Sequence, residues 1–396
     1  MKETWRWFGP ADPIPLAHVK QAGATGIVTA LHHLYPGEAW SLDEVFKRKD
    51  ELLAAGFEWS VVESIPVPNE IKLQSGRYRQ LIGAWKDSLV AVAKAGVQTI
   101  CYNFMPLVDW TRTDARWFLP TTGYALRFDV VDFAAYELFI LGRKGAEADY
   151  SDQQIQAAHT RFASMTEARR GDLEKIILAG LPGGGVRYDR ETFQSSIAEY
   201  QGMTAEQLRS SLIEFLVEIV PVAQELGVRL AIHPDDPPRA LFGVPRIVST
   251  AEDVRKLFAA CDSTANGLTF CVGSFGARED NDLLSMVREF GARIHFLHLR
   301  QVTREPDGSF YEAEHLAGSS DMVGLIHAML KEEANRRAAG RLDHNIPMRP
   351  DHGHLLADDI GKKSNPGYSL VGRLKGLAEL RGVIQGLKFA VPELRG

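Results

Sequence analysis

One stretch of eight residues, 347–354, concentrates charged and titratable side chains: Arg349, Asp351, His352 and His354. It also contains two prolines and a glycine, which do not suit the interior of a long helix or a central strand. We therefore predict a short strand that ends in a rigid loop. An adjacent carboxylate and imidazole suit metal ligation or acid–base catalysis. The alternative is a surface loop with solvated charges.

Three further residues that can ligate a metal lie at the ends of other apolar segments: His233, Cys271 and His298. Together with Asp351 they lie at the ends of four consecutive predicted strands, and long stretches of chain separate each from the next. A buried cysteine is often a small core residue, so Cys271 could simply be packed. His295 competes with His298 for the same role, although strand alternation places the two on opposite faces.

The four side chains indicate a transition metal. Calcium and magnesium prefer shells of oxygen ligands, whereas two imidazoles, a thiolate and a carboxylate select a softer ion. Zinc would fill its tetrahedron with these four ligands and form a closed site. Iron(II) or manganese(II) would keep open positions for a hydroxy acid, so we expect Mn²⁺ or Fe²⁺.

The elements that must position these residues alternate between strand and helix. Apolar strand-like segments alternate with amphipathic helical segments, and this pattern predicts parallel strands with right-handed crossovers. Eight such units close into an α/β (β/α)8 TIM barrel, with functional residues at the carboxyl ends of the strands. The eight predicted strands are 5–9, 26–31, 59–64, 97–104, 228–233, 268–271, 293–300 and the start of 347–354.

The alternation is interrupted after the fourth strand. Residues 105–203 contain an aromatic hairpin at 117–128, two helical stretches and a glycine run at 183–185 without a phosphate-binding pattern. We predict that 105–203 is an insertion that caps the C-terminal face, and that residues 1–396 form one domain.

The composition is that of a soluble globular protein, with 396 residues, 45% apolar and 24% charged. A net charge of −6 argues against nucleic-acid binding. Neither a membrane-spanning segment nor a signal peptide is recognised, so no membrane partner is expected. Three widely spaced cysteines fit a reducing cytoplasm. A homo-oligomer is among the states that the sequence allows.

Linked motifs at 233–238, 270–274, 296–300, 348–354 and 365–368 resemble bacterial mannonate dehydratases, and the similarity runs along nearly the whole chain. The resemblance implies a xylose-isomerase-like barrel that dehydrates D-mannonate to 2-keto-3-deoxy-D-gluconate in hexuronate (glucuronate) catabolism. It implies manganese or iron(II) held by His233, Cys271, His298 and Asp351.

The resemblance also implies an acid–base pair, His352 and Tyr368. Dehydration needs one group to take the C2 proton and another to protonate the leaving oxygen, and the sequence does not assign these roles. Tyr368 could instead be a packing residue at a helix start. Arg349 and Arg300 are candidates for the substrate carboxylate or for salt bridges within the barrel. Weaker substrate-binding candidates are His354, Glu63, Asn103 and His32.

Two other functions are compatible with a metal-binding barrel. A sugar isomerase or epimerase is the nearer one, but such sites typically use carboxylates and histidines, so Cys271 disfavours it. A metal-dependent endonuclease needs a multi-metal carboxylate site and a basic groove, which the acidic net charge disfavours.

Overall fold

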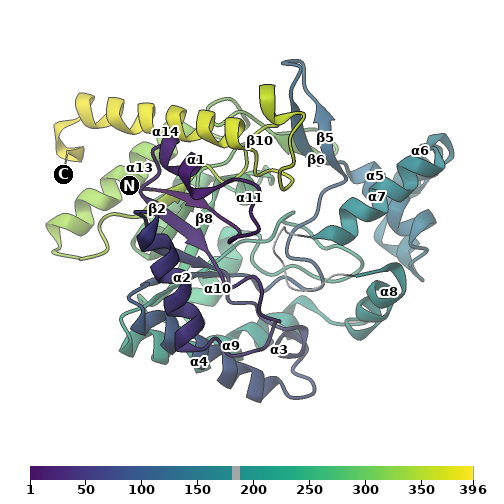
Figure 1. Cartoon of the computed structure of the whole chain (residues 1–396). Coiled ribbons are helices and arrows are strands. Elements are labelled where there is room, and N and C mark those ends of the chain that lie inside the picture. Colours follow the sequence, from purple (N-terminus) through teal and green to yellow (C-terminus); the bar gives the residue numbers. More distant parts are fainter. Residues whose placement is uncertain (181–187, 396) are drawn as a thin grey trace.

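Eight parallel strands close into a barrel in the computed structural model, which describes residues 1–180 and 188–395 (Figure 1). The predicted α/β barrel is confirmed. The first strand lies earlier than the predicted 5–9, because Lys2 and Glu3 already pair with the last strand. In order around the barrel the strands are β1 (Lys2–Arg6), β2 (Gly26–Thr29), β3 (Glu58–Glu63), β4 (Thr99–Tyr102), β7 (Arg229–Ile232), β8 (Asn266–Cys271), β9 (Ile294–His298) and β12 (Pro347–Arg349).

Helices follow the strands and cover the outside of the barrel. Side chains cap several of them: Ser41 accepts from the backbone of Glu44, and Thr204 forms a capping box with Gln207. Thr250 caps the helix after β7 and forms a capping box with Asp253. The main helices are α1 (Leu16–Gln21), α2 (Leu42–Ala54), α4 (Tyr78–Lys94), α9 (Ala205–Glu225), α10 (Ala251–Ala260), α12 (Leu283–Phe290), α13 (Met322–Ala338) and α14 (Leu370–Ala390). Short ones are α3 (Asn69–Leu73), α11 (Val272–Gly276), η3 (Gly291–Arg293), η4 (Ala357–Asp359) and η5 (Pro392–Leu394).

The interior of the barrel is filled by side chains and is not a channel. Val28, Val61, Cys101, Ala231 and Phe296 form a buried cluster contributed by five strands. A larger apolar cluster lies between the strands and the surrounding helices. Burial on both faces explains why these strands read as continuous apolar runs in the sequence. The rigid barrel can therefore hold strand-end residues in fixed positions.

The insertion after β4 begins with the predicted hairpin, β5 (Asp114–Phe118) and β6 (Tyr124–Phe128), which pair antiparallel. Helices follow: α5 (Val130–Ala135), the π-helix η1 (Tyr136–Ile140), η2 (Ala146–Asp149), α6 (Asp152–Ser164), α7 (Glu167–Ala179) and α8 (Arg190–Glu199). Figure 1 shows these helices to the right of the barrel. Their apolar cluster includes Leu241 and Val302 from barrel loops, so these helices pack against the barrel. The glycine run at 183–185 lies outside the described residues.

A second sheet, not predicted from the sequence, joins the insertion to the loop after β9. Its order is β10 (Val302–Arg304), β11 (Phe310–Glu312), β6 and β5. β11 pairs antiparallel with β6, so Phe310 lies opposite Phe128. The two new strands have three residues each, too few to show a period of two. The sheet joins the insertion to the segment that follows β9.

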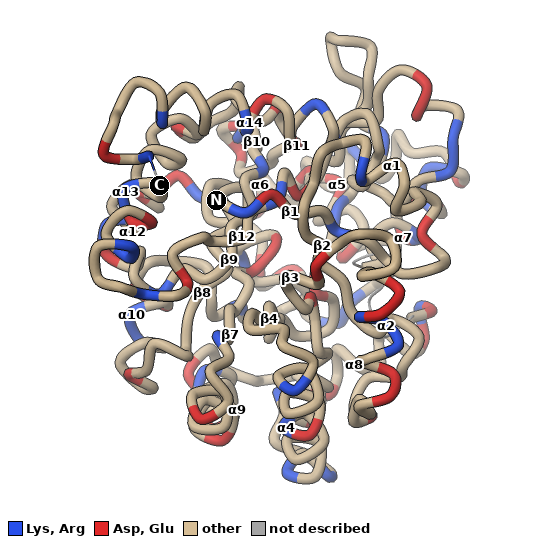
Figure 2. Tube along the Cα trace, turned by 60° about the vertical axis from the view of Figure 1, so that its left-hand side comes forward, with Lys and Arg blue, Asp and Glu red and all other residues tan. Residues whose placement is uncertain are grey.

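The surface carries both signs of charge. Figure 2 shows basic and acidic positions interspersed along the outer helices in that view. Within the described ranges, no helix has the length and apolar character needed to cross a bilayer.

Candidate active site

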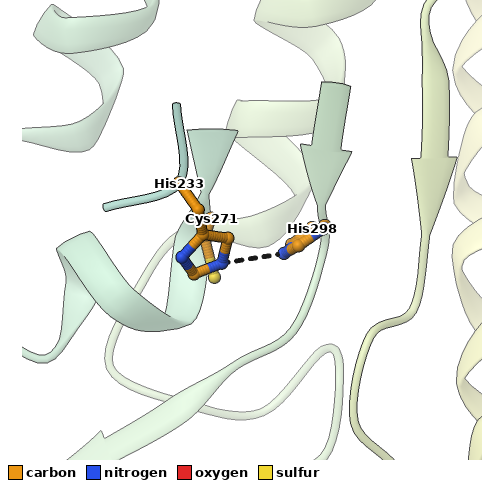
Figure 3. Close-up of side chains that lie close together, drawn as sticks. All are labelled: His233, Cys271 and His298. Carbon is orange, nitrogen blue, oxygen red and sulfur yellow. Dashed lines mark hydrogen bonds between the residues drawn. The ribbon is translucent and has the colours of Figure 1, made fainter. Parts of the chain in front are cut away.

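Three of the four predicted metal ligands meet at the carboxyl ends of neighbouring strands. His233 directly follows β7, Cys271 ends β8 and His298 ends β9, where it pairs in register with Cys271. One donor atom from each, two imidazole nitrogens and one sulfur, lie within 4.8 Å of one another (Figure 3). Parallel strands bring their ends to the same rim, which explains how distant sequence positions meet.

The hydrogen bonds of His233 prepare it to ligate through Nε2. Its Nδ1 lies 2.6 Å from the carbonyl oxygen of Pro234, which can only accept, so Nδ1 carries the proton. Nε2 therefore presents its lone pair, and it faces Nδ1 of His298 at 3.1 Å. Nε of Arg349 donates to Nε2 of His298, so Nδ1 of His298 carries the proton and donates it to this lone pair.

The pKa values of the buried Cys101 and Cys271 are shifted in opposite directions. Burial and the charge of Glu63 raise the pKa of Cys101 well above its usual range. Burial also raises the pKa of Cys271, but the charge of Arg300 and hydrogen bonds with His233 and His298 outweigh it. The pKa of Cys271 is thus held well below its usual range, which favours the thiolate that a metal needs.

Asp351 lies beside this group and is not part of it. Its Oδ2 is 3.7 Å from Nδ1 of His298, while Arg300 and Arg349 pair with its carboxylate at 3.0 and 2.7 Å. Burial raises the pKa of Asp351, but Arg349 and His352 lead the charges that hold it well below its usual range. Its backbone has a φ of +62°, so the chain turns sharply where β12 has ended.

The donor chemistry fits a transition metal. Two imidazole nitrogens and a thiolate converge, with an ionised carboxylate next to them, and such mixed nitrogen, sulfur and oxygen sets bind borderline and soft divalent ions. His295, the competitor of His298, lies elsewhere: its Nε2 is 2.8 Å from the carbonyl oxygen of Thr264. Burial, together with Arg336 and Arg229, lowers its pKa to about 3.

The predicted acid–base pair lies together at the same mouth. The rings of His352 and Tyr368 are perpendicular, with centroids 5.2 Å apart, and both side chains are buried. Burial, only partly offset by Arg349, raises the pKa of Tyr368 to about 12, so its hydroxyl stays protonated at neutral pH. Nδ1 of His352 lies 3.0 Å from Oε1 of Glu312. Phe8 packs edge-on against Tyr368.

Arg349 and Arg300 both form buried ion pairs. Each pair matches the second role predicted for these arginines, a salt bridge within the barrel. Arg349 donates to Glu63 at 2.9 Å and pairs with Asp351. Arg300 pairs with Asp351 and donates to Glu312 at 2.7 Å. It also donates to Asp236 and Ser274. Both guanidinium groups already have carboxylate partners within the protein, so neither is unpaired and available to a substrate.

The weaker candidates have local partners as well. Glu63 also pairs with Arg6 at 2.8 Å, and its second oxygen lies 3.7 Å from Nε2 of His298. Asn103, directly after β4, donates to Asp109 at 3.3 Å. The ring of His32 packs on Phe8. These contacts give no separate support for a role of Glu63, Asn103 or His32 in substrate binding.

Sequence reasoning missed three residues of this site: Arg112, Asp236 and Glu312. Arg112 is fully buried and donates to both acids, at 2.7 Å to Asp236 and 2.8 Å to Glu312. Asp236 belongs to the motif at 233–238, so its presence there was a usable signal. Arg112 and Glu312 lie outside every motif: Arg112 precedes β5 and Glu312 ends β11.

Comparisons with known proteins place the whole chain in one family. A family model described as D-mannonate dehydratase (UxuA) matches residues 1–392. The mannonate dehydratase of Saccharophagus degradans is 55% identical over 389 residues, covering 98% of each chain. Mannonate dehydratase 2 of Agrobacterium fabrum is 54% identical over 388 residues, again covering 98% of each. The crystal structure of mannonate dehydratase from Streptococcus suis serotype 2 has a TM-score of 0.77 and 31% identity, covering 99% of this chain and 95% of that one.

Proposed function

The chain belongs to the D-mannonate dehydratase (UxuA) family of hydro-lyases, and we propose that it removes water from D-mannonate to give 2-keto-3-deoxy-D-gluconate. The observation that carries this proposal is the juxtaposition of three metal-competent donors with a buried imidazole–phenol pair. We place the reaction in hexuronate catabolism, and in the cytoplasm, since widely spaced cysteines fit a reducing compartment. Family membership favours this activity over the isomerase and endonuclease alternatives.

The proposed metal ligands are Nε2 of His233, Sγ of Cys271, a ring nitrogen of His298 and the carboxylate of Asp351. Their chemistry suits manganese(II) or iron(II). A bound ion would supply Lewis-acid stabilisation of the negative charge that develops on the substrate. Asp351 would have to exchange part of its pairing with Arg300 or Arg349 for the ion, since both arginines hold it here.

His352 and Tyr368 are proposed to move the protons. A base takes the proton from C2, the C2–C3 double bond forms as the C3–O bond breaks, and an acid protonates the departing oxygen to give water. The resulting enol then becomes the 2-keto acid. Tyr368 suits the acid because its raised pKa, about 12, keeps the phenol protonated. His352 suits the base because its Nδ1 is engaged by a carboxylate, which leaves Nε2 to accept a proton.

The proposal is tested by incubating purified protein with D-mannonate and following 2-keto acid formation. We expect formation of one 2-keto acid per substrate consumed, loss of activity after chelation, and its return with manganese(II) or iron(II). Failure of metal-loaded, folded protein to convert D-mannonate would overturn the proposed substrate. Conversion that survives complete chelation would overturn the proposed metal.

A further inference from the structure

Glu312, the last residue of β11, receives hydrogen bonds from three distant parts of the chain. Its Oε1 accepts from Arg112 at 2.8 Å, from Arg300 at 2.7 Å and from Nδ1 of His352 at 3.0 Å. Only 3% of the residue is exposed. Burial raises the pKa of Glu312, but Arg300, His352 and Arg112 hold it well below its usual range, so the group is a carboxylate.

This contact determines the tautomer of His352. An ionised carboxylate has no proton to donate, so Nδ1 of the imidazole must carry the shared proton. In the neutral ring, Nε2 then keeps its lone pair. The ring is also held by Tyr368 and by Trp110, whose centroids lie 5.2 and 6.0 Å away in edge-on packing. His352 is thus restricted in both orientation and proton position.

We propose that Glu312 is the positioning residue of the proton-transfer step: it holds His352 in the Nδ1–H tautomer and leaves Nε2 as the nitrogen that accepts the C2 proton. The inference rests on the proposed function, since it concerns the base of that reaction. A carboxylate that orients a catalytic histidine and stabilises the imidazolium formed on proton uptake is a recurrent solution in enzymes.

The location of Glu312 gives the second sheet a role beyond covering the barrel. β11 is held against β6 of the insertion, where Tyr311 lies opposite Arg127. On the other side, Nε2 of His354 lies 2.8 Å from the carbonyl oxygen of Glu312 and fixes its backbone. Arg112, which precedes β5, belongs to the same insertion. Docking of the insertion therefore places the carboxylate that orients His352.

The test compares Glu312→Gln with the wild-type, metal-loaded protein on D-mannonate and on D-mannonate deuterated at C2. Glutamine keeps an acceptor oxygen but loses the charge. We expect kcat to fall about 10- to 100-fold, with KM and bound metal unchanged. This loss is smaller than the 10²–10⁴-fold rate contribution of a positioned base, because the base itself is kept. The isotope effect on kcat/KM should rise, because removal of the C2 proton becomes slower. Glu312→Asp, which keeps the charge but withdraws it from His352, should show the same signature and serves if the glutamine variant does not fold.

Glu305→Gln is the matched control, because Glu305 lies on the same hairpin and holds Arg127 of β6 at 2.6 Å without touching His352. It should leave the isotope effect unchanged. In a His352→Asn background, Glu312→Gln should cause no further loss of kcat. Multiplicative losses in the double variant, or an unchanged isotope effect in both Glu312 variants, would overturn the positioning role. Inactivity of the wild-type protein on D-mannonate would instead reject the proposed function.

Discussion

Nε of Arg349 donates a hydrogen bond to Nε2 of His298 at 3.0 Å, so the guanidinium binds the ring nitrogen opposite the one that faces His233. The other ring nitrogen, Nδ1, lies 3.1 Å from Nε2 of His233. The same guanidinium pairs with Glu63 and Asp351. Arg349 thus links β12, β9 and β3 and fixes the orientation of the His298 ring.

Replacing Arg349 by alanine should lower the free energy of unfolding by about 3 kcal/mol, because two buried carboxylates lose a cationic partner. The loss should lie at the lower end of the range for broken buried pairs, since Glu63 keeps Arg6 and Asp351 keeps Arg300. Urea denaturation measures it. The control Arg255→Ala removes an exposed arginine paired with Glu289 and should change stability little. Equal effects of the two substitutions would contradict the structural role of Arg349.

Chelation should abolish activity, and manganese(II) or iron(II) should restore it better than magnesium. The reason is the donor set: imidazole nitrogens and a thiolate prefer these ions, whereas magnesium prefers oxygen ligands. Activity assays on metal-free protein titrated with each ion provide the measurement. Full restoration by magnesium alone would be incompatible with the proposed ligands.

Cys271→Ser should strongly reduce bound metal while the fold is retained, because a neutral hydroxyl replaces a thiolate that its surroundings stabilise. Metal analysis and circular dichroism measure the two properties. Cys261→Ser is the matched control, since Cys261 follows α10 and lies outside the site. Normal metal content in the Cys271 variant would show that this residue only packs in the core.

Tyr368→Phe should lower kcat by roughly 10²–10⁴-fold and leave metal content and KM near the wild-type values, because only the proton-donating hydroxyl is removed. His352→Asn should behave similarly once its metal content has been checked, since it adjoins Asp351. Steady-state kinetics on D-mannonate give both constants. Near-wild-type turnover by the Tyr368 variant would leave that residue with a packing role only.

His295 should make the protein less stable in acid. Its folded-state pKa of about 3 lies below the ordinary value of 6.5, so the unfolded chain binds one more proton between these two pH values. The free energy of unfolding should therefore fall as the pH falls through this window, by up to about 1.4 kcal/mol per pH unit from this group. Urea denaturation at several pH values should show a shallower dependence for His295→Gln. An identical dependence in both proteins would contradict a buried neutral imidazole.

The barrel and most of the proposed metal site could be predicted from local patterns. Alternating apolar strands and amphipathic helices determine a parallel barrel, because few other arrangements bury both kinds of element. Parallel strands in a barrel bring their carboxyl ends to one rim, so His233, Cys271 and His298 at strand ends had to converge. Period-two alternation also separated His298 from His295 correctly.

Only the tertiary structure decided which groups surround those residues. Glu312 touches Arg112 and His352, which are far from it in sequence, and three-residue strands leave no periodic signal that would reveal the sheet responsible. The tertiary structure also decided that Arg349 and Arg300 pair with buried carboxylates. In the sequence, an arginine that faces a substrate looks the same as one in an ion pair. Periodicity depends on neighbours along the chain, whereas the partner of a buried charge depends on which loops the fold brings together.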